Sequence, residues 1–272
     1  MAGCTADHPA APPAEASLAR AGYDEPGMHR QYGTPIKVGH GMARTYVVLD
    51  ARSGQAPQEL GIALDAMVLE GLPDDGDEHS YVLPMPAQGP APYQFVELDW
   101  NPEGHPPAGV YTAPHFDFHF YALPKAEWTA IDPGTNPDFA AQANRLPTGS
   151  YVPPTYVVLK PPFLQPSDVA VPHMGVHWVN FTSPELNGQP FTTTFIYGSW
   201  NGRFTFYEPM ITRAYLLTQP NDVVTNIPVP ALRPLAGYYP SAYRVTYDAR
   251  AKEYRIALTS LSWSDAGGAP PS

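Results

Sequence analysis

The stretch Phe195-Ile-Tyr-Gly-Ser-Trp200, Asn201-Gly202, Arg203-Phe-Thr-Phe-Tyr-Glu208 is the strongest structural signal in the chain. Two runs rich in aromatic and β-branched residues flank an Asn-Gly pair. Both residues of this pair tolerate the positive φ that a type I′ turn requires. The pattern therefore predicts two antiparallel strands joined by a two-residue hairpin, and it indicates a protein built from β-sheet.

The turn also predicts the register of this hairpin. Pairing Trp200 with Arg203 sets Glu208 opposite Phe195, because side chains alternate between the two faces of a strand. The same face would then carry Tyr197, Phe204 and Phe206. A carboxylate on an aromatic face is costly unless it is paired, hydrogen-bonded or bound to a metal. The alternative is that Glu208 lies at the open end of its strand and reaches water.

The composition extends the β prediction to the whole chain. Its 272 residues include 35 prolines and 22 glycines, which leave little room for long helices and favour short strands joined by turns. We expect an all-β domain at residues 31–264, either a single β-barrel or a two-sheet β-sandwich, closed by a hairpin at residues 243–258. One short helical insertion is expected between Glu127 and Asn144.

Charge limits the kinds of partner. The net charge is −11 and only four residues are lysine, which argues against nucleic acid or an anionic membrane surface as a partner. No stretch approaches the roughly 18 apolar residues of a membrane-spanning helix. A small-molecule ligand and assembly into a homo-oligomer stay open.

The N-terminal segment indicates export. Ala2-Gly3-Cys4 matches the end of a bacterial lipobox, in which small residues precede the cysteine that is lipidated. The following Pro/Ala-rich run predicts that residues 1–30 form a flexible tether, and residues 265–272 are expected to be a disordered tail. Membrane attachment would then occur only through lipidated Cys4, with the protein anchored to the cell envelope in the periplasm or at the cell surface. The alternative is an ordinary disordered N-terminus of a cytosolic protein.

Four of the nine histidines fall in two related segments, Pro114-His-Phe-Asp-Phe-His-Phe120 and Pro172-His-Met-Gly-Val-His-Trp178. Both follow the pattern Pro-His-x-x-x-His-aromatic, 58 residues apart. The similarity suggests an internal duplication or two strands with equivalent roles, and chance is the competing explanation.

Strand geometry limits how these histidines act together. In a strand, His115 and His119 lie about 13 Å apart, so one ion cannot take both without a bulge. Asp117 lies between them on the same face. We predict that His119, His177 and Glu208 converge on one buried site from three strands. His105, in the loop Asn-Pro-Glu-Gly-His-Pro-Pro, is expected outside it.

Mixed histidine and carboxylate ligands suit a divalent transition metal, zinc ahead of iron or manganese. The candidate metal ligands are His115, Asp117, His119, His173, His177 and Glu208. Two readings without a metal stay open. In one, Asp117 orients a histidine as general base, with Tyr121 or Tyr197 as hydrogen-bond donor. In the other, the histidines are hydrogen-bonded structural residues on a sheet face.

Three segments together resemble a known family: residues 98–121, 171–179 and 191–212, with His-Phe-Asp-Phe-His-Phe-Tyr and Met-Gly-Val-His-Trp as the most specific parts. The family is a bacterial group of exported proteins, a domain of unknown function related to a Thermus protein under extracytoplasmic sigma-factor control. The resemblance implies export and oligomerisation, and it supplies no reaction. Thr193 departs from the family pattern, which often has a histidine there, and this weakens any metal site that needs a ligand at that position.

These features lead to two functional hypotheses. The first is an exported lipoprotein with a His/carboxylate metal site in the β-domain, acting as a metal-dependent hydrolase or oxygenase. The second is a non-catalytic envelope lipoprotein that binds an apolar or aromatic small molecule, or a protein partner. The sequence has no GxSxG, HExxH, CxxC or Walker motif, so no catalytic residue is assigned.

Overall fold

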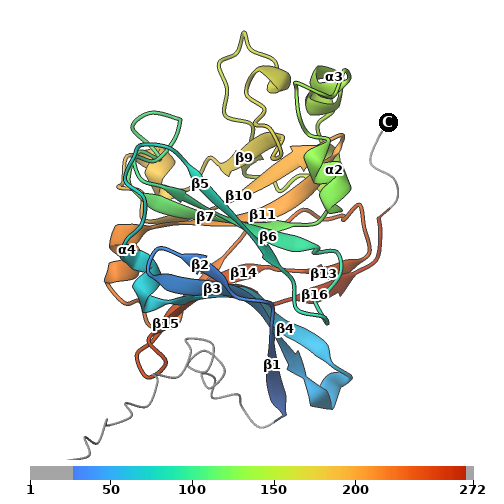
Figure 1. Cartoon of the computed structure of the whole chain (residues 1–272). Helices are drawn as coiled ribbons and strands as arrows, with labels where there is room; N and C mark the ends of the chain where they lie inside the picture. Colours follow the sequence, from blue (N-terminus) through green and yellow to red (C-terminus); the bar gives the residue numbers. More distant parts are fainter. Residues whose placement is uncertain (1–26, 268–272) are drawn as a thin grey trace, which may run out of the picture.

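Two seven-stranded antiparallel sheets pack face to face in the computed structural model, which describes residues 27–267 (Figure 1). The first sheet has the order β1 (Met28–Tyr32), β3 (Gly41–Asp50), β4 (Ala56–Asp65), β15 (Glu253–Thr259), β14 (Ala242–Asp248) and β12 (Val223–Asn226), with β2 (Ile36–Val38) paired to β3. The second has the order β5 (His79–Pro84), β6 (Phe95–Asn101), β7 (His115–Tyr121), β11 (Arg203–Thr212), β10 (Thr193–Trp200), β9 (Val176–Asn180) and β8 (Tyr156–Val157). The architecture is therefore a β-sandwich, and among the described strands no barrel closes.

Shorter elements connect these strands. They are α2 (Lys125–Thr129), α3 (Phe139–Asn144), α4 (Arg213–Leu217), the 3₁₀ turns η1 (Ala51–Ser53), η2 (Ala66–Leu69), η3 (Gly149–Tyr151), η4 (Pro166–Asp168) and η5 (Pro184–Asn187), and the small pair β13 (Gly237–Tyr239) and β16 (Ser262–Ser264). The single helical insertion expected between Glu127 and Asn144 is in fact two separate short helices, α2 and α3, and α2 already begins at Lys125. None of the helices in the described part is long and apolar enough to cross a membrane.

The main core lies between the two sheets. Phe116, Phe118 and Phe120 of β7 are fully buried there, together with aliphatic residues of β4. Burial of each such side chain contributes about 1.5–3 kcal/mol to folding. Because strand side chains alternate, the remaining residues of β7 face away from the sandwich core.

The second sheet is also covered on its outer face. Figure 1 shows α2 and α3 on the side of this sheet that lies away from the first sheet. Phe139 of α3 packs against Trp200 in a second apolar cluster, which also contains Phe206 and Tyr121. As a result, every residue of β6 and β7 is buried, and a polar side chain on this outer face cannot simply reach water.

The β10–β11 hairpin has the predicted turn, with φ of 49° at Asn201 and 86° at Gly202. Its predicted register is wrong beyond the first two pairs. A bulge between Gly198 and Ser199 shifts the pairing, so that Glu208 lies opposite Ile196. Glu208 therefore shares the outer face with Phe206, while Phe195, Tyr197 and Phe204 point into the sandwich core. A β-bulge of this kind changes the face of every residue beyond it.

The folded part begins earlier than predicted. β1 starts at Met28, inside the segment assigned to the tether, and pairs along its whole length with β3. At the other end, β16 ends at Ser264. Cys4 and residues 1–26 lie outside the described residues, as do residues 268–272.

Candidate metal centre

A row of polar side chains crosses the outer face of the second sheet. Strand pairing places Asp99 beside Asp117, Glu97 beside His119, and Asn101 beside His115. All six side chains are at least 95% buried. A row of this kind is costly in an apolar interior unless its charges are compensated.

His119 lies between two carboxylates. Its Nδ1 atom is 3.1 Å from Asp99 Oδ2, and its Nε2 atom is 3.2 Å from Glu208 Oε2. All three side chains are about 99% buried or more. Neither ring nitrogen has hydrogen-bond geometry toward its neighbour, although both contacts are short. The ring is held in place by stacking on Tyr121 and by an edge contact with Phe206.

His177 reaches the same point from β9. It pairs with Gly198 of β10, and because glycine has no side chain, the His177 ring crosses β10 to lie 5.5 Å from the ring of Phe206 on β11. One ligand atom each from His119, His177 and Glu208 lie within 4.8 Å of one another. The predicted convergence of these three residues from three strands is therefore confirmed.

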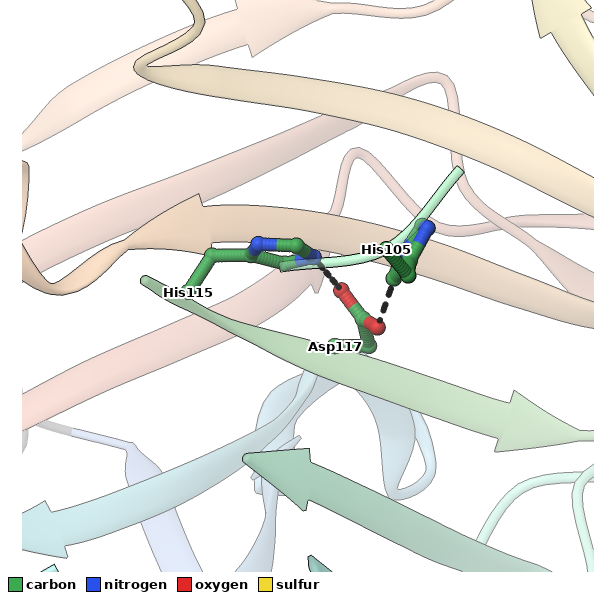
Figure 2. A group of neighbouring side chains, drawn as sticks. All are labelled: His105, His115 and Asp117. Carbon is green, nitrogen blue, oxygen red and sulfur yellow. Dashed lines mark ion pairs between the residues drawn. The ribbon is translucent and has the colours of Figure 1, made fainter. Parts of the chain in front are cut away.

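A second group lies beside the first and consists of His105, His115 and Asp117 (Figure 2). The Nε2 atom of His115 is 3.2 Å from Asp117 Oδ1, and that of His105 is 3.3 Å from Asp117 Oδ2. The expectation that His105 lies outside the site is wrong. The loop between β6 and β7 folds back over the sheet and brings this histidine onto the carboxylate of Asp117.

His173, in contrast, belongs to neither group. The chain bends before β9, where Val171 and Gly175 form an isolated bridge, and His173 adopts a positive φ of 66° in that bend. Its ring stacks on Trp128 of α2, with its Nδ1 atom 3.2 Å from the Trp128 carbonyl oxygen. The prediction of His173 as a metal ligand is therefore wrong, because the second His-x-x-x-His segment is a turn followed by a strand.

Burial and neighbouring charges shift the pKa values of the first group. Burial raises the pKa of Glu208 to about 7, against the opposing effect of His119. Burial alone would lower the pKa of His119, but Glu208 and Asp99 raise it well above its usual value. Burial, reinforced by His119 and His105, lowers the pKa of His177 to about 3. His177 therefore offers a neutral nitrogen lone pair at neutral pH.

Two further pKa shifts belong to the surroundings. Burial and the neighbouring Asp99 raise the pKa of Glu97 to about 7. Burial would lower the pKa of His105, yet contact with Asp117 raises it to about 9. Without a metal, the cluster retains protons at neutral pH that a divalent cation would displace.

Residues of both groups line one cavity of about 520 Å³, a size that suits a small molecule. The polar surface of the cavity comes from Glu78, His105, Asp117, His119, Asp168, His177 and Glu208. The remaining wall is largely apolar and includes Leu159, Val169, Ala170, Val171, Met174, Val179 and Ile196. Among the described residues that line this cavity there is no lysine or arginine, so the carboxylates have only histidines as cationic neighbours.

Sequence reasoning missed Glu97, Asp99, Asn101 and His105. Three of them were detectable, because Glu97, Asp99 and Asn101 occupy alternate positions of an otherwise apolar strand. Because side chains alternate along a strand, all three lie on one face of the sheet. His105 carried no comparable signal, because loop paths do not follow from periodicity.

Comparisons with protein-family models, curated proteins and solved structures found no match for this chain. The resemblance to exported sigma-factor-controlled proteins stays a prediction.

Proposed function

We propose that this protein is a metal-dependent hydrolase whose divalent ion is held by His119, His177 and Glu208. The observation that carries the proposal is the convergence of these three ligand atoms, from three strands, at the side of a cavity without lysine or arginine in the described residues. The 3.2 Å separation of His119 Nε2 and Glu208 Oε2 matches the roughly 3.3 Å edge of a tetrahedron with metal–ligand bonds of about 2.0–2.1 Å.

Asp99 orients His119 and determines which of its ring nitrogens carries the proton. Asp99 faces Nδ1 of His119, which favours a proton on Nδ1 and leaves the Nε2 lone pair toward Glu208. This carboxylate–histidine arrangement is the usual support of a metal-bound imidazole. The three ligands leave coordination positions open toward the cavity, where a bound metal would activate water or polarise a substrate.

Two histidines and one carboxylate serve both zinc hydrolases and iron oxygenases. Zinc hydrolysis is our primary proposal, and oxygenation with ferrous iron is the alternative. The apolar wall at Leu159, Val171 and Met174 favours a substrate with an apolar body and a polar group directed at the ion. The same wall also supports the second candidate function, binding of such a molecule without chemistry.

The test begins with elemental analysis of protein purified without a histidine tag. His119→Gln, His177→Gln and Glu208→Gln should each lose one metal equivalent relative to the wild type. His79→Gln is the matched control, because His79 pairs with Asp75 at the surface, 2.8 Å away, and should retain full metal content. Unchanged metal content in all three site variants would contradict the proposal.

Activity measurements then separate the candidate functions. Zinc-loaded protein should hydrolyse members of a panel of ester, amide and phosphoester substrates, and Glu208→Gln should not. Oxygen consumption by the iron-loaded protein would support the oxygenase instead. Tight ligand binding with neither reaction would support the non-catalytic alternative.

We also propose that the protein is exported and anchored to the cell envelope through lipidated Cys4. The Ala2-Gly3-Cys4 triplet and the Pro/Ala-rich run after it support this proposal. When expressed in bacteria behind a lipoprotein signal peptide, the protein should incorporate labelled fatty acid and partition into detergent, and Cys4→Ser should abolish both. Incorporation that survives Cys4→Ser would refute lipidation at this residue.

A further inference from the structure

The group of His105, His115 and Asp117 shares no residue with the proposed catalytic centre, yet it borders the same cavity. His115 is fully buried, and its Nδ1 atom lies 2.6 Å from the carbonyl oxygen of Ala113. A carbonyl oxygen only accepts hydrogen bonds, so Nδ1 must carry the proton. In the neutral ring, Nε2 then presents a lone pair to Asp117 Oδ1, 3.2 Å away.

His105 repeats this arrangement on the other carboxylate oxygen. Its Nδ1 atom lies 2.8 Å from the carbonyl oxygen of Pro106, and its Nε2 atom lies 3.3 Å from Asp117 Oδ2. The two imidazole centroids are 4.8 Å apart. Figure 2 shows the two rings on either side of the carboxylate. With both rings neutral, two nitrogen lone pairs and a carboxylate would face one another, and the side chains of His115 and Asp117 are almost completely buried.

Two arrangements would remove this repulsion. Both rings could be protonated, with two imidazolium ions packed together around one carboxylate. Alternatively, one cation could accept a lone pair from each of the three side chains. The geometry favours the cation, because His115 Nε2 and Asp117 Oδ1 have no hydrogen-bond partner although they are 3.2 Å apart. An N–H donated to the carboxylate would satisfy both atoms.

We propose that His105, His115 and Asp117 bind a second divalent transition metal, with zinc as the first candidate. One ligand atom from each of the three residues lies within 4.8 Å of the other two. Each imidazole nitrogen is 3.2–3.3 Å from one oxygen of the Asp117 carboxylate, a separation close to that of two ligand atoms on an ion with bonds of about 2.0–2.1 Å. Each of the three ligands also has a hydrogen-bond partner outside the proposed site. His115 donates to the carbonyl oxygen of Ala113, and His105 donates to that of Pro106. The Asn101 amide donates to Asp117 Oδ2 at 2.8 Å. Such partners fix the orientation of metal ligands.

The second ion would affect what the cavity binds. His105 and Asp117 line it together with His119 and Glu208, so two cations would lie along one cavity. The ligand class that fits two neighbouring cations is an anion, such as a phosphoester or carboxylate, whose apolar portion contacts the cavity wall. This ligand class depends on the proposed catalytic ion as well, whereas the second site itself does not.

Zinc titration of the chelator-treated protein, followed by native mass spectrometry and calorimetry, tests the inference. The wild type should bind two zinc ions. Asp117→Asn, which preserves shape, and His105→Gln, whose parent side chain is 29% exposed, should each bind one. Glu208→Gln should also bind one, and Asp117→Asn combined with Glu208→Gln should bind none. His79→Gln should still bind two.

The variants distinguish failure of this inference from failure of the proposed function. One zinc ion in the wild type, lost in Glu208→Gln and retained in Asp117→Asn, would refute the second site and leave the catalytic centre intact. One zinc ion lost in Asp117→Asn and retained in Glu208→Gln would support the second site and refute the catalytic centre. Nitrogen NMR that finds His105 and His115 doubly protonated at saturating zinc would also refute the second site.

Discussion

Asp99 lies behind His119 in the proposed metal site and would orient that ligand. It is completely buried, and its Oδ2 atom lies 3.1 Å from His119 Nδ1. Asp99→Asn removes the negative charge of this side chain but keeps its shape. The substitution should weaken the interaction that orients His119 without leaving a cavity. We expect Asp99→Asn to lower the affinity of the first site for zinc about 10–100-fold, the usual cost of losing an outer carboxylate.

Competition against a zinc-sensitive dye measures this affinity, and saturating zinc should restore full stoichiometry. Asp75→Asn is the control, because Asp75 also contacts a histidine, His79, but lies at the surface. Equal affinity in Asp99→Asn and the wild type would show that Asp99 does not support a metal ligand.

Single residues were predictable where an energetic cost identified them. Glu208 was identified because a carboxylate among aromatic side chains needs a compensating partner, and His119 is such a partner although the face predicted for Glu208 was wrong. Asp99 could have been found by the same reasoning applied to β6. His105 could not, since the loop path that brings it to Asp117 depends on contacts distant in sequence.

At the scale of elements, β10 acts as a spacer between β9 and β11, and at Gly198 this spacer has no side chain. β10 separates β9, which carries His177, from β11, which carries Glu208. A Cβ atom at Gly198 would collide with the ring of Phe206. The absence of a side chain therefore allows His177 and Phe206 to meet above β10 and keeps His177 near the other two ligands.

We expect Gly198→Ala to destabilise the protein by about 1–3 kcal/mol, the usual cost of overpacking a core, and to remove zinc from the first site. The second site, on β7 and its preceding loop, should keep its ion. Chemical denaturation and zinc stoichiometry measure the two effects. Gly134→Ala is the control, because the atoms nearest to its added Cβ belong to the Asp132 side chain and lie 3.3 Å or more away. Full zinc binding in Gly198→Ala would contradict the spacer role.

Local sequence patterns predicted the strands and turns better than the residue register between paired strands. The Asn201-Gly202 turn and the hairpin of β14 and β15 follow from short-range preferences, and both form. The bulge at Gly198 was not predictable, because an alternating sequence fits either register until the sheet packs on both faces. The bend at His173 was hidden for a similar reason, since the Pro-His-x-x-x-His pattern resembles that of a true strand.

For the whole molecule, composition indicated an all-β domain but left open a barrel or a sandwich. Whether a barrel or a sandwich forms depends on the order of the strands in each sheet. For example, β4 pairs with β15, which is distant in sequence, and no local pattern encodes this pairing. The sandwich architecture gives the second sheet two different faces. One face of the second sheet fills the core, while the other lies beneath α2 and α3 and can bury charged groups.

Such an arrangement would link metal binding to the stability of the whole domain. The proposed ligands come from β7, β9, β11 and the loop before β7, and they assemble only in the folded chain. An ion that binds only the folded state stabilises it by about 2.7 kcal/mol per site at a free concentration 100 times its dissociation constant. For a domain of this size, about 1 kcal/mol shifts the melting temperature by roughly 2–4 °C.

We therefore expect chelator treatment to lower the melting temperature by about 5–10 °C for each site emptied, and added zinc to restore it in proportion to its free concentration. Scanning calorimetry at several zinc concentrations measures this response. Asp117→Asn combined with Glu208→Gln should melt at one temperature with or without zinc, because neither site can bind. Restored stability should accompany restored stoichiometry, because the same bound ions account for both. Zinc binding to the wild type with no change in melting temperature would show that the ions bind elsewhere than in these buried groups.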